Sequence, residues 1–298
     1  MLSPLVAGVD GSAESLAAVE WAAREAVRRE RALRLLHARN WHPRQGEIAN
    51  AAERQLAWRI LRRAEERVLA TCRDVRLYDE QVEGPATAAL LKAAEDAELL
   101  VLGSRGLSGF TGFLVGSVAL GVVARATRPV VLVRAGEEAG NEHLRADEGT
   151  ASGRTGDRDV VLGVDVNDPC DEVLDFGFET ARLRHARLRV LHAWHAPNPF
   201  TLGPGEVGLV SEPQRAEEWL GFLSAVLHER RDKYPDVEVL ETVVEDKASN
   251  ALLRAATGAG LLVVGHRLTE RPTVPRTGPV THAVIHHVGC PVAVVPHF

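Results

Sequence analysis

Lysine, cysteine and long apolar runs are scarce in this chain of 298 residues. Its three cysteines are far apart and form no CxxC pair, which excludes a disulfide framework and favours a reducing cytoplasm. No apolar run reaches about 18 residues and no signal-peptide pattern follows Met1, so neither a membrane partner nor export is expected. The net charge is −6 and aromatic residues make up 5%, which argues against nucleic acid as a partner.

What the chain does contain is an internal repeat. Four segments of the first half each have a copy in the second half. The pairs are Leu5–Asp10 with Val160–Asp165, Leu35–Ala38 with Val190–Ala193, Leu100–Gly103 with Leu262–Gly265, and Arg128–Val133 with Cys290–Val295. Four matched landmarks in one order indicate a duplicated domain, and the period is too long for a solenoid. We therefore expect domains at 1–136 and 158–298. The acidic segment 137–157 has too little apolar surface to order itself and is interpreted as a linker.

Apolar runs alternate with helical patterns in both halves. In the first half, strands are predicted over 5–9, 32–38, 74–82, 98–103 and 129–134, and helices over 13–30, 48–71, 85–96 and 113–127. The second half follows the same order and ends with a helix over 279–288 and a strand over 291–296. The pattern predicts an α/β fold with two tandem doubly wound, Rossmann-like domains, each a five-stranded parallel sheet between helices. Ligands of such sheets lie beyond the carboxyl ends of the strands, where Asp10, Ala38 and Gly103 fall.

A glycine-rich connection follows the fourth predicted strand. Its spacing is Gly103-x2-Gly106-x9-Gly116-Ser117, and it leads into a predicted helix. Glycine lets backbone N–H groups approach a phosphate, and a helix N-terminus adds a positive dipole. The connection is not a Walker A sequence, and no lysine lies between Lys92 and Lys233. The absence of a phosphate-directed lysine favours binding over rapid hydrolysis.

The complete glycine spacing, the strand-end Asp10 and the duplication together resemble the universal stress protein family, in particular its tandem-domain actinobacterial members. The resemblance covers both halves and excludes the linker. It implies a five-stranded parallel α/β sandwich that binds ATP, accompanied by Mg²⁺. At the adenosine end, it implies that Asp10 accepts hydrogen bonds, with Val9 beside it, and that Ala38 lines the adenine slot.

The resemblance also assigns the phosphate end of the site. The residues that it implies around the ribose and phosphates are Gly103, Arg105, Gly106, Gly116, Ser117 and Val118. The second half departs from this pattern, because Leu268 stands where glycine is expected and Pro279, which has no N–H, stands where Ser117 does. We therefore expect the first half to hold the nucleotide and the second to bind it weakly or not at all. Attraction of a phosphate or another anion by Arg267, Arg271 and Arg276 is left open for the second half.

The function that the resemblance implies is regulation in stress response or dormancy signalling, without enzymatic activity. ATP would change a surface that an unidentified protein partner recognises. The runs 129–134 and 291–296 are expected to meet as an intramolecular pseudo-dimer, with a homodimer of the full chain left open. Two alternatives remain at this point: a slow ATPase or other ATP-dependent enzyme, and a scaffold that binds no nucleotide.

Three side-chain patterns allow more than one interpretation. Asp10 alone is also a candidate N-cap for the helix over 13–30. His37 and His192 occupy matched positions and are interpreted as structural or site-lining. His282 and His286 share one helical face, as zinc ligands do, but histidines near a helix C-terminus also interact favourably with its dipole.

Overall fold

The computed structural model describes residues 2–39, 47–104, 115–136, 158–195, 212–268 and 277–298. The elements of the first half are β1 (Leu5–Gly8), α1 (Ala13–Arg28), β2 (Leu33–Arg39), α2 (Glu47–Thr71), β3 (Leu77–Glu83), α3 (Ala86–Glu95), β4 (Leu99–Ser104), α4 (Ser117–Val123) and β5 (Val130–Arg134). Those of the second half are β6 (Val160–Gly163), α5 (Asp171–Leu183), β7 (Leu188–Trp194), α6 (Glu212–Lys233), β8 (Val239–Glu245), α7 (Ala248–Ala255), β9 (Leu261–Arg267), α8 (Pro279–His287) and β10 (Val292–His297).

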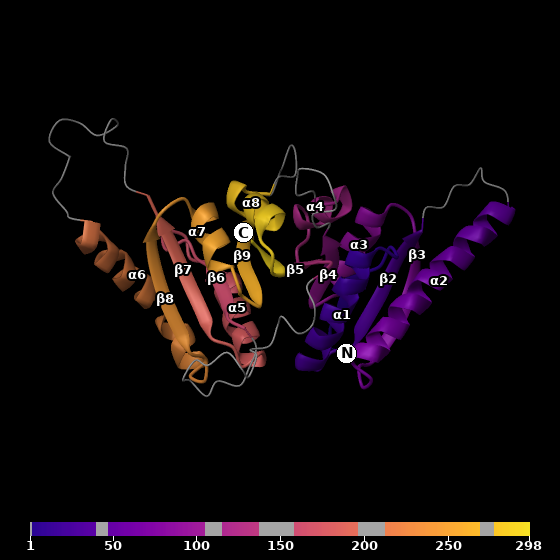
Figure 1. Ribbon diagram of the computed structural model, residues 1–298, viewed down its shortest axis with the longest axis horizontal. Coiled ribbons are helices and arrows are strands. Elements are labelled where there is room, and N and C mark those ends of the chain that lie inside the picture. Colours follow the sequence, from indigo (N-terminus) through magenta and orange to yellow (C-terminus); the bar gives the residue numbers. More distant parts are fainter. Residues whose placement is uncertain (1, 40–46, 105–114, 137–157, 196–211, 269–276) are drawn as a thin grey trace.

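These strands form one continuous sheet in the order β3-β2-β1-β4-β5-β10-β9-β6-β7-β8. All neighbours within a half run parallel, which confirms the doubly wound fold predicted for each copy. β5 and β10 pair antiparallel, with Leu132 opposite Val292 and Val130 opposite Val294. Figure 1 shows the halves side by side, joined at this pair. The predicted meeting of the two final strands within the chain is confirmed.

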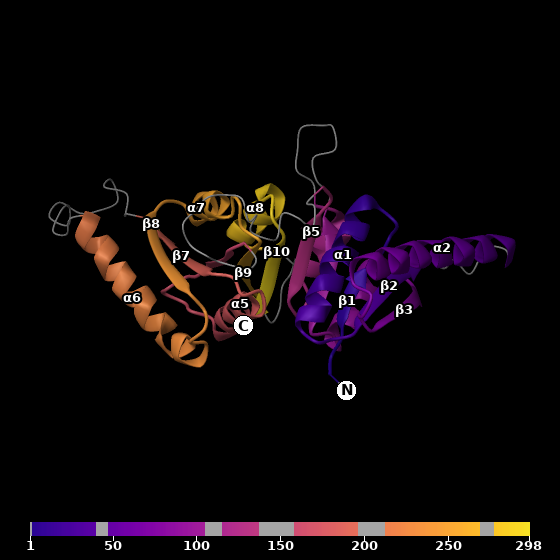
Figure 2. The same cartoon turned by 60° about the horizontal axis from the view of Figure 1, so that its bottom comes forward.

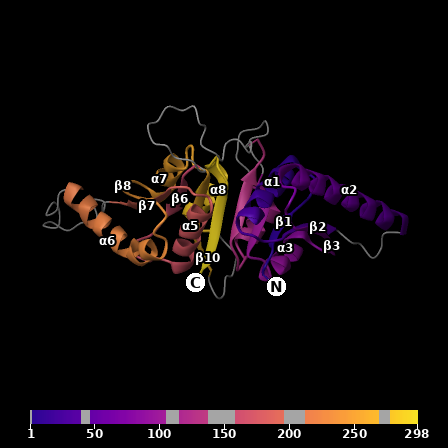
Figure 3. The same cartoon turned by 90° about the horizontal axis from the view of Figure 1, so that it is seen from below.

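The helices cover both faces of the sheet. Core residues of α1, α2, α5 and α6 pack on one face, and those of α3, α4, α7 and α8 pack on the other. Each apolar layer therefore runs through both halves. Figures 2 and 3 show the helices and the sheet in two turned views. Strands with both faces covered need near-continuous apolar sequences, which is why the central strands are Val- and Leu-rich.

Two predicted elements were wrong in detail. In the described part of the helix predicted over 113–127, only Ser117–Val123 is helical. It ends early because the chain tightens at Ala124, whose N–H reaches both Leu120 O and Val122 O, and turns before β5. The strand predicted over 74–82 begins at Leu77 and is mostly exposed. It lies at the sheet edge, where α2 covers one face, so it does not need an unbroken apolar run. The predicted linker, 137–157, lies outside the described residues.

A buried ionic cluster joins the two halves beneath β5 and β10. Glu25 of α1 is 0% exposed and accepts hydrogen bonds from Arg29 Nε at 2.7 Å and from Arg184 Nη2 at 2.8 Å. Arg184 caps α5 in the other half, and its guanidinium lies 5.1 Å from the Trp21 ring centroid. Arg29 Nη2 also donates to Thr180 Oγ1 of α5 at 3.0 Å. The helices α1 and α5 are therefore held together by charge-assisted bonds as well as by apolar packing.

The charge state of Glu25 follows from these neighbours. Burial on its own would raise the pKa of the carboxyl group, but attraction to Arg184 and Arg29 outweighs burial and lowers the pKa to about 2. Glu25 is consequently ionised at neutral pH even though it is inaccessible to water. A buried carboxylate of this kind depends on keeping its partners.

Replacing Arg184 with Ala is expected to destabilise the chain by about 3–5 kcal/mol, because Glu25 then loses one of its two buried hydrogen-bonded arginines. Urea unfolding measures the change. Arg62→Ala is the control, since Arg62 pairs with Glu65 on an exposed helix face and contributes little there. A loss for Arg184→Ala as small as that for Arg62→Ala would contradict the role of the cluster.

The pH dependence of stability should carry the signature of Glu25. Its folded pKa of about 2 lies below the ordinary value of 4.5, so its contribution is complete above pH 4.5 and is lost as the pH falls towards 2. The wild-type chain should lose about 3 kcal/mol more over this interval than Glu25→Gln, whose side chain does not titrate. Urea midpoints measured across the interval test this, and parallel curves for the two proteins would refute it.

Candidate functional site

The carboxyl edge of the first half brings together residues that are far apart in sequence. β1 lies between β2 and β4, so Val9 and Asp10, which follow β1, lie beside Ala38 of β2 and Gly103 of β4. The remaining described candidates, Gly116, Ser117 and Val118, form the cap and first turn of α4. Arg105 and Gly106 lie outside the described residues.

The side chain of Asp10 is held in position by hydrogen bonds from the turn before α1. Its Oδ1 accepts hydrogen bonds from the N–H of Ser12 at 2.9 Å and from the Ser12 hydroxyl at 2.5 Å. The N-cap of α1 is Ser12, whose side chain accepts from the N–H of Ser15, so the capping role considered for Asp10 belongs to its neighbour. Partial burial raises the pKa of the Asp10 carboxyl group, but the hydrogen bonds from Ser12 outweigh burial and lower it. An exposed, ionised acceptor therefore stands at the end of β1.

Histidines brace the first strand of each half in the same way. His37 Nδ1 lies 2.7 Å from Val9 O, and His192 Nδ1 lies 3.1 Å from Val164 O. Each contact ties the end of the second strand to the residue before the strand-end aspartate. The interpretation of both histidines as structural, site-lining residues agrees with this geometry.

The two glycines of the first-half motif that the structure describes serve different purposes. A Cβ on Gly103 would lie 2.5 Å from the Glu14 carbonyl carbon, so β4 and the start of α1 can approach only with glycine there. Among the residues that the structure describes, no atom lies within 4 Å of a Cβ built on Gly116, and its φ of −61° is ordinary, so neither their packing nor the backbone conformation demands glycine. It also leaves α4 without a side-chain cap, so the first N–H groups of that helix are not occupied by a cap.

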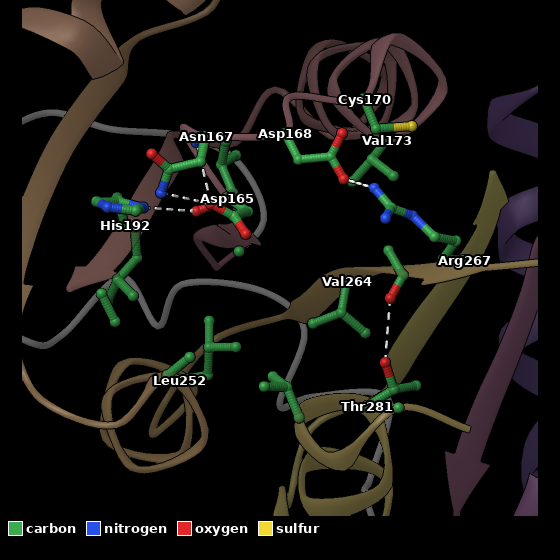
Figure 4. A pocket seen from close by; sticks show the side chains of 18 of the residues that line it. Asp165, Asn167, Asp168, Cys170, Val173, His192, Leu252, Val264, Arg267 and Thr281 are labelled. Carbon is green, nitrogen blue, oxygen red and sulfur yellow. Dashed lines mark hydrogen bonds and ion pairs between the residues drawn. The ribbon is translucent and has the colours of Figure 1, made fainter. Parts of the chain in front are cut away.

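In the second half, the equivalent edge encloses a cavity of about 740 Å³. It opens beyond β6, β7 and β9, with α7 and α8 beneath it (Figure 4). Through the repeat, eight of the nine first-half candidates have a counterpart among the lining residues. The ninth candidate, Gly106, aligns with Leu268, which is not among them. The matching residues are Val164, Asp165, Ala193, Gly265, Arg267, Gly278, Pro279 and Val280.

One part of the cavity wall is aromatic and aliphatic. His192 is 3% exposed, and its ring centroid lies 4.9 Å from that of Trp219 on α6. Leu252 of α7 and Val264 of β9 line the wall below it (Figure 4). Asp165 stands at this end and repeats the turn of the first half, with its Oδ1 accepting from the N–H of Asn167 at 3.0 Å.

The other part of the cavity is polar. Asp168, in the connection after β6, forms an ion pair with Arg267 at the end of β9 (Figure 4). Thr281 of α8 donates to Gly265 O at 3.0 Å. Cys170 donates from its Sγ to Glu172 at 3.0 Å, and burial followed by this carboxylate raises the pKa of the thiol to about 11. The thiol is therefore protonated and unreactive at neutral pH.

Sequence reasoning did not find Asp168, Trp219 or the cavity itself. Asp168 had a detectable signal, because the repeat aligns it with Ala13, so the second copy gains a carboxylate near its strand-end aspartate. Trp219 had no such signal, because nothing in the sequence of α6 indicates which residue of that helix contacts β7.

The other polar groups of the described chain offer less. The ring centroids of His282 and His286 lie 4.4 Å apart, and burial, together with His286 and His287, lowers the pKa of His282. Among the residues that the structure describes, no group of three or more histidine, cysteine or acidic side chains is placed to hold a metal ion. Within the same residues, no helix combines the length and apolarity needed to cross a bilayer.

Known proteins resemble the whole chain. The model of the universal stress protein family matches residues 1–134 and 158–296. A universal stress protein of Mycobacterium tuberculosis is 30% identical over 97% of this chain and 96% of its own length. One from Mycolicibacterium smegmatis is 27% identical over 98% and 96%. The crystal structure of a universal stress protein from Archaeoglobus fulgidus aligns over 98% of both chains with a TM-score of 0.73 and 17% identity, which shows a shared fold.

The contrast between the two glycines predicts that the same substitution has effects of different size at the two positions. Gly103→Ala should destabilise the chain by about 1–3 kcal/mol, because the added methyl group meets backbone atoms of α1. Gly116→Ala should cost less, at most about 0.5–1 kcal/mol, because its methyl group meets no atom of the described residues and only the poorer N-capping by alanine weakens α4. Urea unfolding of both variants without any ligand measures the difference, and equal effects would show that Gly103 is not required by packing.

Proposed function

This chain belongs to the universal stress protein family, and we propose that it is a regulatory, ATP-binding member whose first half holds the nucleotide. The observation that carries the proposal is the carboxyl edge of the first half, where Asp10, Ala38 and Gly103 lie at neighbouring strand ends. The duplicated half has a cavity of about 740 Å³ at the same edge. Its size falls within the range of about 300–1,000 Å³ typical of small-molecule sites. The first half carries the same strand-end residues with the complete glycine spacing.

The nucleoside would bind at the strand ends of the first half. Asp10 is ionised and exposed, so it would accept hydrogen bonds from hydroxyl groups of a ribose. Ala38 offers a small, partly exposed apolar surface suited to a planar base, and Val9, which is buried, would support the site from within the core. The hydrogen-bond contact between His37 Nδ1 and Val9 O would keep the end of β1 in position before a ligand binds.

The phosphates would lie near Gly116 and Ser117. Gly116 leaves room for close approach, and Ser117 adds a hydroxyl donor beside it. From the sequence, Arg105 and Gly106 would complete this end. Mg²⁺ would accompany the phosphates and neutralise part of their charge.

We propose regulation rather than catalysis for this site. No lysine lies between Lys92 and Lys233 to stabilise a transferred phosphoryl group, and the acidic Asp10 would contact the nucleoside end. Occupancy by ATP would instead change the surface around the carboxyl edge of the first half. A protein partner in the cytoplasm would recognise that change during stress or dormancy.

The substitution Gly116→Asp tests the proposal without damaging the fold. Aspartate is a favourable N-cap and its side chain would enter open space, so α4 should be as stable as before or more so. Its carboxylate would stand where phosphate is proposed to lie, and the ATP affinity should fall at least about tenfold. Equilibrium dialysis with ATP and Mg²⁺ measures affinity, and thermal unfolding measures stability.

Gly116→Asn is the matched control, because it has the same shape and capping ability without the charge. It should bind ATP more tightly than Gly116→Asp, and the difference reports repulsion by the added carboxylate. If the unmodified chain binds no ATP, or if Gly116→Asp binds ATP as tightly as the unmodified chain does, the first half is not the proposed nucleotide site.

A further inference from the structure

The cavity of the second half has its own charge arrangement, which the first-half motif does not share. We propose that this cavity binds an uncharged, planar ligand of about nucleoside size, and that Asp168 makes it reject ligands that carry phosphate. This site goes beyond the proposed ATP site and does not depend on it, because it uses different residues in the other copy of the domain.

The walls of the cavity suit a flat ring. Ala193, Leu252 and Val264 offer small or aliphatic surfaces, and the buried ring of His192 packs against Trp219 at the rim. In Figure 4 His192 and Leu252 lie along one side of the space and Val264 lies at its base. Apolar walls with few polar groups favour a ligand whose main surface is an uncharged ring system.

The polar group at that end is an acceptor. Asp165 is held by the N–H and the side-chain amide of Asn167, which both reach its Oδ1, at 3.0 and 3.3 Å. Its carboxylate stands at the cavity wall and would accept a hydrogen bond from a ligand hydroxyl or amine. The ligand class is therefore a planar ring that carries donor groups.

The opposite end disfavours an anion. Arg267 is the counterpart of Arg105, but its guanidinium is already paired with Asp168. A phosphate would have to displace Asp168 from Arg267 and then lie beside the displaced carboxylate. In the first half the aligned residue is Ala13, so this carboxylate has no counterpart at that position.

Among the residues that the structure describes, the other groups around the cavity do not restore a phosphate site, and Arg271 and Arg276 lie outside those residues. Pro279 occupies the first position of α8 and has no N–H, where the first half has Ser117. Burial lowers the pKa of His266, a hydrogen bond to the backbone of Ala124 opposes this and nearby His297 adds to it; the pKa is lowered on balance, so this lining residue adds no positive charge at neutral pH. Among the described lining residues, Asp165 and Asp168 face one arginine, which leaves the cavity acidic.

The test isolates the second half within the full chain. A parent carrying Asp10→Ala and Gly116→Asp has both ends of the first-half site disabled. Adenosine and ATP are the probes, because both carry the same ring and ribose hydroxyl groups and differ in the phosphates. Isothermal titration at constant ionic strength should show adenosine binding to this parent at least about tenfold more tightly than ATP.

Adding Asp168→Ala to this parent should remove most of the discrimination. Arg267 is then unpaired, so the ATP affinity should rise about tenfold while the adenosine affinity stays within about twofold. Adding Asp165→Ala instead should remove adenosine binding, which locates the probe in the cavity. Asp232→Ala removes one carboxylate from an exposed position on α6 and should alter neither affinity.

Several results would overturn the inference. They are no adenosine binding to the parent, adenosine binding that survives Asp165→Ala, ATP binding equal to adenosine binding, and an unchanged ratio after Asp168→Ala. Failure of ATP to bind the first half would be seen separately, in the comparison of the unmodified chain with Gly116→Asp. The two proposals can therefore fail independently.

Discussion

The antiparallel pairing of β5 with β10 is the contact on which the arrangement of the two halves depends. A five-stranded parallel sheet ending at either strand would present an unpaired edge of apolar residues, which invites association with other chains. Pairing within one chain covers both edges and turns two sheets into one. The apolar layers on its two faces then extend through both copies, and the bonds between Glu25 and Arg184 fasten the helices alongside.

The duplication preserved the scaffold of the site more strictly than its charges. Both copies keep the strand-end aspartate, with its Oδ1 held by the residue two positions later, and the histidine that contacts the preceding carbonyl. These bonds set the floor of the site. The groups around the opposite end differ, since Asp168 and Pro279 replace Ala13 and Ser117. If the two proposals hold, the shared strand-end groups and the different groups at the opposite end would lead the two copies of the domain to favour different ligands.

The comparison of sequence with structure shows where local patterns were sufficient. The central strands were predicted closely because both of their faces are covered, which demands apolar residues at every position. β3 and α4 were predicted less well. β3 is an edge strand with mostly exposed residues, and the extent of α4 depends on how the chain turns towards β5. Neither constraint is visible in the residues of the element itself.

From its order of residues alone, the chain determined its duplication, its alternating βα architecture and the set of residues at the carboxyl ends of the strands, because these depend on periodicity and on neighbours along the chain. The tertiary structure decided the cavity of the second half, the pairing of Asp168 with Arg267 and the joining of Glu25 to Arg184. Each of those brings together groups from distant segments. An ionic or packing interaction depends on distance in space, and only the folded sheet sets that distance.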